Sequence, residues 1–192
     1  MSQRRSQLNP FFATAFLILS CITAMVSLRG EVADITLRSL ATSSDTIVVV
    51  KVTKIEPAAD DISDVGDEYP PVRVATARVL ETWKGPDVKE VQFVATPTEF
   101  CDISSAKEGE TLVLFLDRRN RQPMHIAHVG RGRMAVRNIQ GKSYATLADE
   151  VKAPGGVSIL TKSEGKEKVR LLELRTLRGL VRDYVPQRRD TK

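Results

Sequence analysis

The sequence is poor in the residues that most often carry metal or redox chemistry. Its 192 residues include two cysteines and two histidines. Two cysteines exclude a disulfide-dense scaffold and a cysteine-rich zinc module, and two histidines leave little material for a histidine-based metal centre. Apolar residues make up 42% and charged residues 28%, the balance of an ordinary globular domain. We therefore expect one folded domain without a bound metal or cofactor.

A strong excess of one charge is also lacking. The chain holds 29 basic and 24 acidic residues, a net charge of +5. Without residues 1–33, which carry three basic residues and one acid, 26 basic residues face 23 acids. This balance is too even to indicate nucleic-acid binding from charge, and we expect no nucleic-acid partner.

The longest uncharged run lies near the N-terminus, over residues 11–28, and follows Arg4 and Arg5. A basic start followed by an apolar run is typical of a secretory signal, and this run is nearly long enough to span a membrane. We predict that residues 1–30 are a signal peptide or an N-terminal membrane anchor, so that the protein is secreted or periplasmic. Cys21 stands in a loosely lipobox-like sequence, which leaves lipidation as a third option.

Short apolar runs separated by turn residues cover most of the remaining chain. The run over 46–55 is rich in β-branched residues, and the run over 111–116 is apolar on both faces, which predicts the most buried strand. Strands are predicted over 46–55, 72–83, 88–95, 111–116, 124–129, 133–139 and 144–147. Because no helix is predicted between them, they favour a mainly β fold, an antiparallel barrel or sandwich, with Trp83 shielded.

The ends of this β region are marked by changes of pattern. Residues 35–41 predict a short helix or turn, and the β-barrel domain is expected over 34–152. Pro154-Gly155-Gly156 begins a predicted linker over 153–165. A helical apolar period then predicts an amphipathic helix over 166–185, followed by a polar tail over 186–192. We expect this helix to pack on the barrel; its basic face leaves a membrane surface as the alternative.

Four short motifs resemble those of a known group. They are Ser44-Asp45 before TIVVVKVTKI, the sequence ARVLETWKGP over 77–86, Phe100-Cys101-Asp102, and GETLVLFL over 109–116. Over roughly residues 35–137 the chain resembles a secreted bacterial group of netrin-like, tissue-inhibitor-of-metalloprotease-like domains. The resemblance implies an exported OB-like, five-stranded Greek-key barrel with an accompanying helix, and no established activity.

The inhibitory chemistry of those domains does not carry over. Tissue inhibitors of metalloproteases chelate the protease zinc with the amine and carbonyl of a disulfide-tethered N-terminal cysteine. No cysteine here is placed to become a free N-terminus, and the disulfides of the group are missing. Cys101 is what remains of the pattern.

The most unusual stretch is His128-Val129-Gly130-Arg131-Gly132-Arg133. Glycine at 130 and 132 would let a ligand approach the backbone, and arginines of equal parity would project to one side of an extended segment. We predict a site for a carboxylate, sulfate or phosphate, made by Arg131 and Arg133 with His128 at its edge. The alternative is that both arginines pair with the domain's own acids.

Three other groups of candidate residues have simple structural explanations. His125 and His128 lie three residues apart in a predicted strand, so they face opposite sides and are expected to be structural. The acidic run over 60–68 predicts a solvated loop, with weak calcium binding as the alternative. Cys101 with His128 permits a thiol nucleophile, although a buried structural thiol is the simpler interpretation.

These features together favour an exported, non-enzymatic binding or interaction module at the cell envelope or outside the cell. Its partner is expected to be a protein or an anionic polysaccharide. Two alternatives remain open at this stage. One is an extracytoplasmic enzyme that uses Cys101 and His128, and the other is a membrane-anchored subunit of an envelope assembly.

Overall fold

The structure is a computed structural model in which residues 35–58, 72–96, 105–118, 123–165 and 167–185 are described. Several predictions fall outside these residues: the signal or anchor over 1–30, the acidic run over 60–68, Cys101, and the tail over 186–192. Within the described residues, no helix is long and apolar enough to cross a membrane.

The alternating apolar runs form strands where the sequence predicts them, with one exception discussed below. The strands are β1 (Ile35–Thr36), β2 (Thr46–Pro57), β3 (Arg73–Lys84), β4 (Glu90–Val94), β5 (Thr111–Asp117), β6 (His125–Ile126), β7 (Arg133–Ile139), β8 (Lys142–Leu147), β9 (Val151–Lys152), β10 (Leu160–Glu164) and β11 (Glu167–Glu173). The mainly β class is therefore confirmed.

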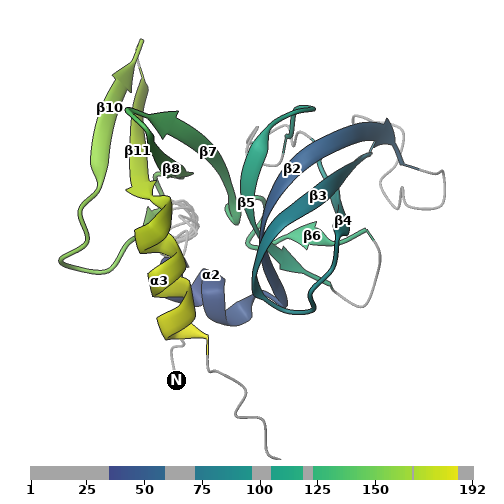
Figure 1. Cartoon of the computed structure of the whole chain (residues 1–192), viewed down its shortest axis with the longest axis horizontal. Helices are drawn as coiled ribbons and strands as arrows, with labels where there is room; N and C mark the ends of the chain where they lie inside the picture. Colours follow the sequence, from purple (N-terminus) through teal and green to yellow (C-terminus); the bar gives the residue numbers. More distant parts are fainter. Residues whose placement is uncertain (1–34, 59–71, 97–104, 119–122, 166, 186–192) are drawn as a thin grey trace, which may run out of the picture. The chain divides into compact units, whose positions relative to one another are not determined.

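Within the described residues, most strands join one antiparallel sheet in the order β10-β11-β8-β7-β5-β2-β3-β4, with β6 beside β5. A separate parallel pair joins β1 to β9. The long strands β2 and β3 curve strongly (Figure 1), and their pairing contains three register shifts, which bend and twist a strand pair. The path ends at β10 and β4, and the strands that the structure describes form no closed barrel.

Strands β2 and β5 divide the interior into two hydrophobic cores. In β5, Leu112, Leu114 and Leu116 face a strand-side core shared with β3 and β4. Val113 and Phe115 face a helix-side core shared with the helices and β8. All five side chains are fully buried, which confirms the prediction that this strand is the most enclosed.

Two helices cover the helix-side core, and they lie side by side (Figure 1). Helix α2 (Leu37–Ser43) begins with a capping box, in which Thr36 Oγ1 accepts the Ser39 N–H at 2.9 Å and Ser39 Oγ accepts the Thr36 N–H at 3.0 Å. Helix α3 (Leu174–Tyr184) buries Leu177 and Val181. The apolar stripe of the C-terminal helix thus packs on the protein's own core.

The predicted helix over 166–185 and the predicted linker over 153–165 need correction. Strand β10 lies inside the predicted linker, and β11 occupies the first half of the predicted helix. Val169 and Leu172 satisfy a helical stripe, but their backbone pairs with β10 and β8 instead. Long-range strand pairing therefore overrides the helical spacing of the apolar residues, and the C-terminal helix begins only at Leu174.

Candidate functional site

The predicted strand over 124–129 is limited to β6, and the segment that follows β6 makes a left-handed turn. His128, Val129 and Gly130 have φ angles of 51°, 54° and 87°. A left-handed backbone costs an ordinary residue about 1–2 kcal/mol, and a β-branched residue such as Val129 is a genuine outlier there. The Val129 side chain is 63% exposed, so burial of that side chain does not account for the strain.

Strand β5 holds this turn in place. The Ala127 N–H donates to the Phe115 carbonyl at 2.8 Å, and the Phe115 N–H donates to the Gly132 carbonyl at 2.8 Å. A Cβ at Gly132 would lie 2.8 Å from the Phe115 carbonyl oxygen, closer than side chains tolerate. The missing side chain of Gly132 therefore makes room for strand β5. The sequence had predicted that a ligand would use this space.

His128 faces the end of helix α2. Its Nε2 lies 3.1 Å from the Ser43 hydroxyl oxygen, and its ring is half-buried. This contact joins the turn to α2 and helps to over-determine the strained backbone, which is the condition under which strain persists.

The sequence predicted that Arg131 and Arg133 project outward to one side of an extended segment. In the structure they do not. Their side chains are 18% and 17% exposed. Arg133 Nη2 donates to Glu110 Oε1 at 2.6 Å, and Arg131 Nη2 lies 3.8 Å from Glu150 Oε1. Both guanidiniums therefore meet the protein's own acids, the alternative stated above. Their role in binding stays a prediction, as does that of His128.

Both of these arginines also keep a buried donor unpaired. Within the described residues, the Nε atoms of Arg131 and Arg133 have no hydrogen-bond partner. A buried donor without a partner costs about 1–3 kcal/mol. Each of these arginines therefore bonds or approaches an acid through Nη2 while its Nε remains a buried donor at that cost.

Of the remaining sequence candidates, the structure describes the two histidines. Cys101 lies outside the described residues, so an enzyme that uses Cys101 and His128 stays a prediction. His125 is in β6 and His128 is in the turn. In the part of the chain that the structure describes, no group of three or more histidine, cysteine, aspartate or glutamate residues could hold a metal ion.

A groove of about 410 Å³ lies between the end of β3 and helix α3. Trp83 and Thr82 line it from β3. Arg175, Arg178 and Arg182 line it from α3 together with Gly179. The three arginines stand at positions i, i+3 and i+7, so they share one face of the helix, and all three are exposed.

Glu81 connects the two walls of this groove. Trp83 Nε1 donates to Glu81 Oε2 at 3.0 Å, and Arg178 Nη1 lies 3.3 Å from the same oxygen. The carboxylate thereby orients the indole and engages the middle arginine. Because both members of the ion pair are well exposed, it stabilises the fold by at most about 1 kcal/mol. No acid is among the described residues that line the groove.

Lys84 follows Trp83 but serves a structural purpose. Its Nζ donates to the carbonyls of Ala41 and Thr42 at 2.9 and 3.0 Å, which are left unpaired at the C-terminal end of α2. Burial lowers the pKa of the Lys84 ammonium, and the nearby Asp45 carboxylate opposes that shift in part. Lys84 thus fastens β3 to α2, which fixes the wall that carries Trp83.

The sequence does not predict this groove. Trp83 is expected to be shielded, whereas its side chain is half-buried, with one part against the helix-side core and another part lining the groove. The basic face of the C-terminal helix is visible in the sequence. The missing information was that β3 places an aromatic ring opposite that face.

Comparison of the sequence with protein families gives no match, and comparison with curated proteins gives none either.

Proposed function

We propose that this protein is an exported, non-enzymatic binding module, at the cell envelope or outside the cell, whose ligand is an anionic polysaccharide. The observation that carries the proposal is the groove between Trp83 and the three arginines of α3. Guanidinium groups present forked donors that match the carboxylates and sulfates of acidic sugars. The indole offers a large, rigid apolar face with a polar edge, against which a sugar ring can lie.

The groove is suited to binding rather than to chemistry. Among the described residues, the polar side chains that line it are three arginines, a threonine and the indole of Trp83, which supply no general base or activated nucleophile. The neighbouring Glu81 carboxylate is engaged by Trp83 and Arg178. Exposed cations on one helix face attract a polyanion over a distance that salt shortens. Binding that weakens as salt rises is the expected signature.

The proposal includes the OB-like barrel that the sequence resemblance implies. Support comes from residues near Met124, which approach the edge strand β4. The Val94 N–H donates to the Met124 carbonyl, and the Met124 N–H donates to the Gln92 carbonyl, each at 2.9 Å. Since β6 follows Met124 directly and pairs with β5, these bonds connect β4 back towards β5 around the strand-side core. The netrin-like relationship is part of the same proposal.

The test uses a ligand whose charge can be removed without changing its sugar. Polygalacturonate should bind the protein at low salt, and its methyl-esterified form should not. The double variant Arg175→Gln/Arg182→Gln should lose affinity by about tenfold or more, since hydrogen bonds between charged groups are the strong ones. Trp83→Leu should also weaken binding. Isothermal titration calorimetry measures each affinity.

The matched control is Arg73→Gln/Arg78→Gln, two exposed arginines of β3 outside the groove. It changes the net charge by the same amount. If both double variants lose the same affinity, the attraction is general and the groove is not the site. If neither polysaccharide form binds, the proposed ligand is wrong.

Gly179 supplies a second variant that separates binding from folding. A Cβ added there would meet no atom within 4 Å, so a side chain can be added to the helix without a clash. Glycine in a helix interior costs about 1 kcal/mol relative to better helix formers. Gly179→Leu should therefore keep or raise the melting temperature while it fills the groove and removes polygalacturonate binding.

A further inference from the structure

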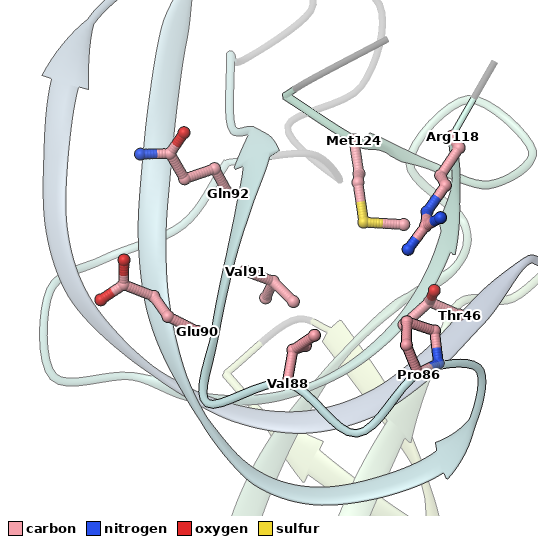
Figure 2. A pocket seen from close by; sticks show the side chains of 8 residues that line it. All are labelled: Thr46, Pro86, Val88, Glu90, Val91, Gln92, Arg118 and Met124. Atoms are coloured by element: carbon pink, nitrogen blue, oxygen red, sulfur yellow. The ribbon is translucent and has the colours of Figure 1, made fainter. Parts of the chain in front are cut away.

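A second pocket lies at the end of the sheet where β2 begins, and it shares no residue with the groove. It encloses about 160 Å³. Figure 2 shows the side chains that line it. They come from the start of β2, the turn before β4, β4 itself, the residue after β5, and the residue before β6: Thr46, Pro86, Val88, Glu90, Val91, Gln92, Arg118 and Met124.

Three apolar side chains form one part of the wall of this pocket. Val88, Val91 and Met124 turn towards its centre, whereas Glu90 and Gln92 extend from the opposite face of β4 (Figure 2). Val91 and Met124 are buried. The interior therefore suits an aliphatic group, and the thioether of Met124 adapts readily to its shape.

Thr46 places an unpaired hydroxyl in this apolar wall. The residue is 1% exposed, and among the described residues its Oγ1 has no hydrogen-bond partner. Such a group is costly to bury and calls for an explanation. Nearby, Gly85 is left without a side chain, and a Cβ there would come within 2.9 Å of Thr46 Oγ1. The Thr46 hydroxyl therefore keeps a hydrogen that no group among the described residues accepts.

Arg118 supplies a cation at the same pocket. Its backbone N–H donates to Asp45 Oδ2 at 2.9 Å, which anchors the residue. Its side chain extends towards Thr46 and Met124 (Figure 2). Among the described residues the guanidinium forms no ion pair with an acid.

We propose that this pocket binds a short aliphatic carboxylate. The Arg118 guanidinium would donate to the carboxylate oxygens, the Thr46 hydroxyl would donate to one of them, and the hydrocarbon tail would lie against Val88, Val91 and Met124. The small volume limits the tail to a short branched chain. A free branched-chain acid and the C-terminal residue of a peptide both present this chemistry, and this inference is independent of the polysaccharide proposal.

The test compares matched acids and neutral amides. The probes are 3-methylbutanoate and its amide, and the peptide Gly-Gly-Val with a free and with an amidated C-terminus. Titration into the purified protein, followed by NMR chemical shifts of the valine and methionine methyl groups, should show saturable binding of an acid. A ligand this small is expected to have a dissociation constant on the order of 1 mM. The amides should show no saturable binding.

Two variants assign the binding to the named groups. Arg118→Gln should weaken acid binding by about tenfold or more. Thr46→Val should weaken it by about two- to tenfold without lowering the melting temperature, because the lost hydroxyl has no partner to abandon. Arg78→Gln, which removes an exposed charge of β3, should bind the acid as the wild type does.

The outcomes separate the two sources and can overturn the proposal. Binding of the free acid alone identifies a site for small organic acids, and binding of the peptide acid identifies a site for chain ends. The proposal is wrong if neither acid saturates, if an amide binds as well as its acid, or if Arg118→Gln binds like the wild type.

Discussion

At Val129, in the left-handed turn, we predict that a substitution stabilises the fold, which is the opposite of the usual effect. Most substitutions destabilise a protein, by about 1 kcal/mol on average. Val129 has φ of 54° and is 63% exposed. We expect Val129→Asn to stabilise the fold, because asparagine adopts this backbone conformation far more readily than a β-branched residue does.

The magnitude follows from three contributions. Relief of the backbone strain gains about 1–2 kcal/mol. About a third of the valine surface is buried, so the lost transfer free energy is roughly 0.5–1 kcal/mol. Asparagine, unlike glycine, adds little freedom to the unfolded chain. The net gain of roughly 0.5–1 kcal/mol corresponds to a rise in melting temperature of about 1–4 °C.

Thermal unfolding followed by circular dichroism measures this shift, with Leu80→Asn as the matched control. Leu80 is also a large exposed hydrophobic residue, 46% exposed, but it lies in the extended strand β3. Asparagine is disfavoured in strands, so this control should lower the melting temperature. If Val129→Asn lowers it by as much as the control does, the turn is not strained and the reasoning fails.

Three further predictions concern the core, the turn and pH. Leu114→Ala should cost about 2–5 kcal/mol in urea unfolding, since the side chain is fully buried; a loss under 1 kcal/mol would place β5 outside the core. Gly132→Ala should cost about 1–3 kcal/mol by the same measurement, because its Cβ would lie 2.8 Å from the Phe115 carbonyl oxygen; an unchanged midpoint would contradict that contact. The hydrogen bond from Arg137 lowers the pKa of Glu164 below 4.5, so this group contributes stability above pH 4.5 that is lost as the pH falls through the folded-state pKa. Glu164→Gln should therefore flatten the acid side of the stability profile, and an unchanged profile would count against the pair.

The strands that the sequence predicted well are those in which the pattern of apolar side chains indicates which faces are buried. In β5, apolar residues fill both faces, and in β2 the β-branched run leaves few alternatives to a strand. The hairpin of β10 and β11 shows the opposite case. Lys162 and Ser163 are exposed in β10, so the strand carries no hydrophobic alternation, and its existence depends on pairing with β11. A single sequence contains no local signal for such a pairing.

The candidate site was only half predictable for a related reason. The basic face of α3 is visible in the sequence because its arginines recur at helical spacing. Trp83 belongs to a strand far away in the chain, and its position opposite that face is a result of tertiary packing. The contacts of Lys84 with Ala41 and Thr42 help to set that position, and nothing in the local sequence announces them.

The near balance of charge in this chain hides how unevenly the fold uses its cations. Arg133 and Arg137 are engaged by Glu110 and Glu164. Arg170 donates to three backbone carbonyls in the segment that follows β8. A cation that is satisfied inside the fold contributes little to an external field, whatever its contribution to net charge. Within the described part of the chain, one of the three arginines that line the groove, Arg178, forms an ion pair, with Glu81. An anionic ligand is therefore favoured by the local excess at that groove, and a net charge close to neutral does not argue against it.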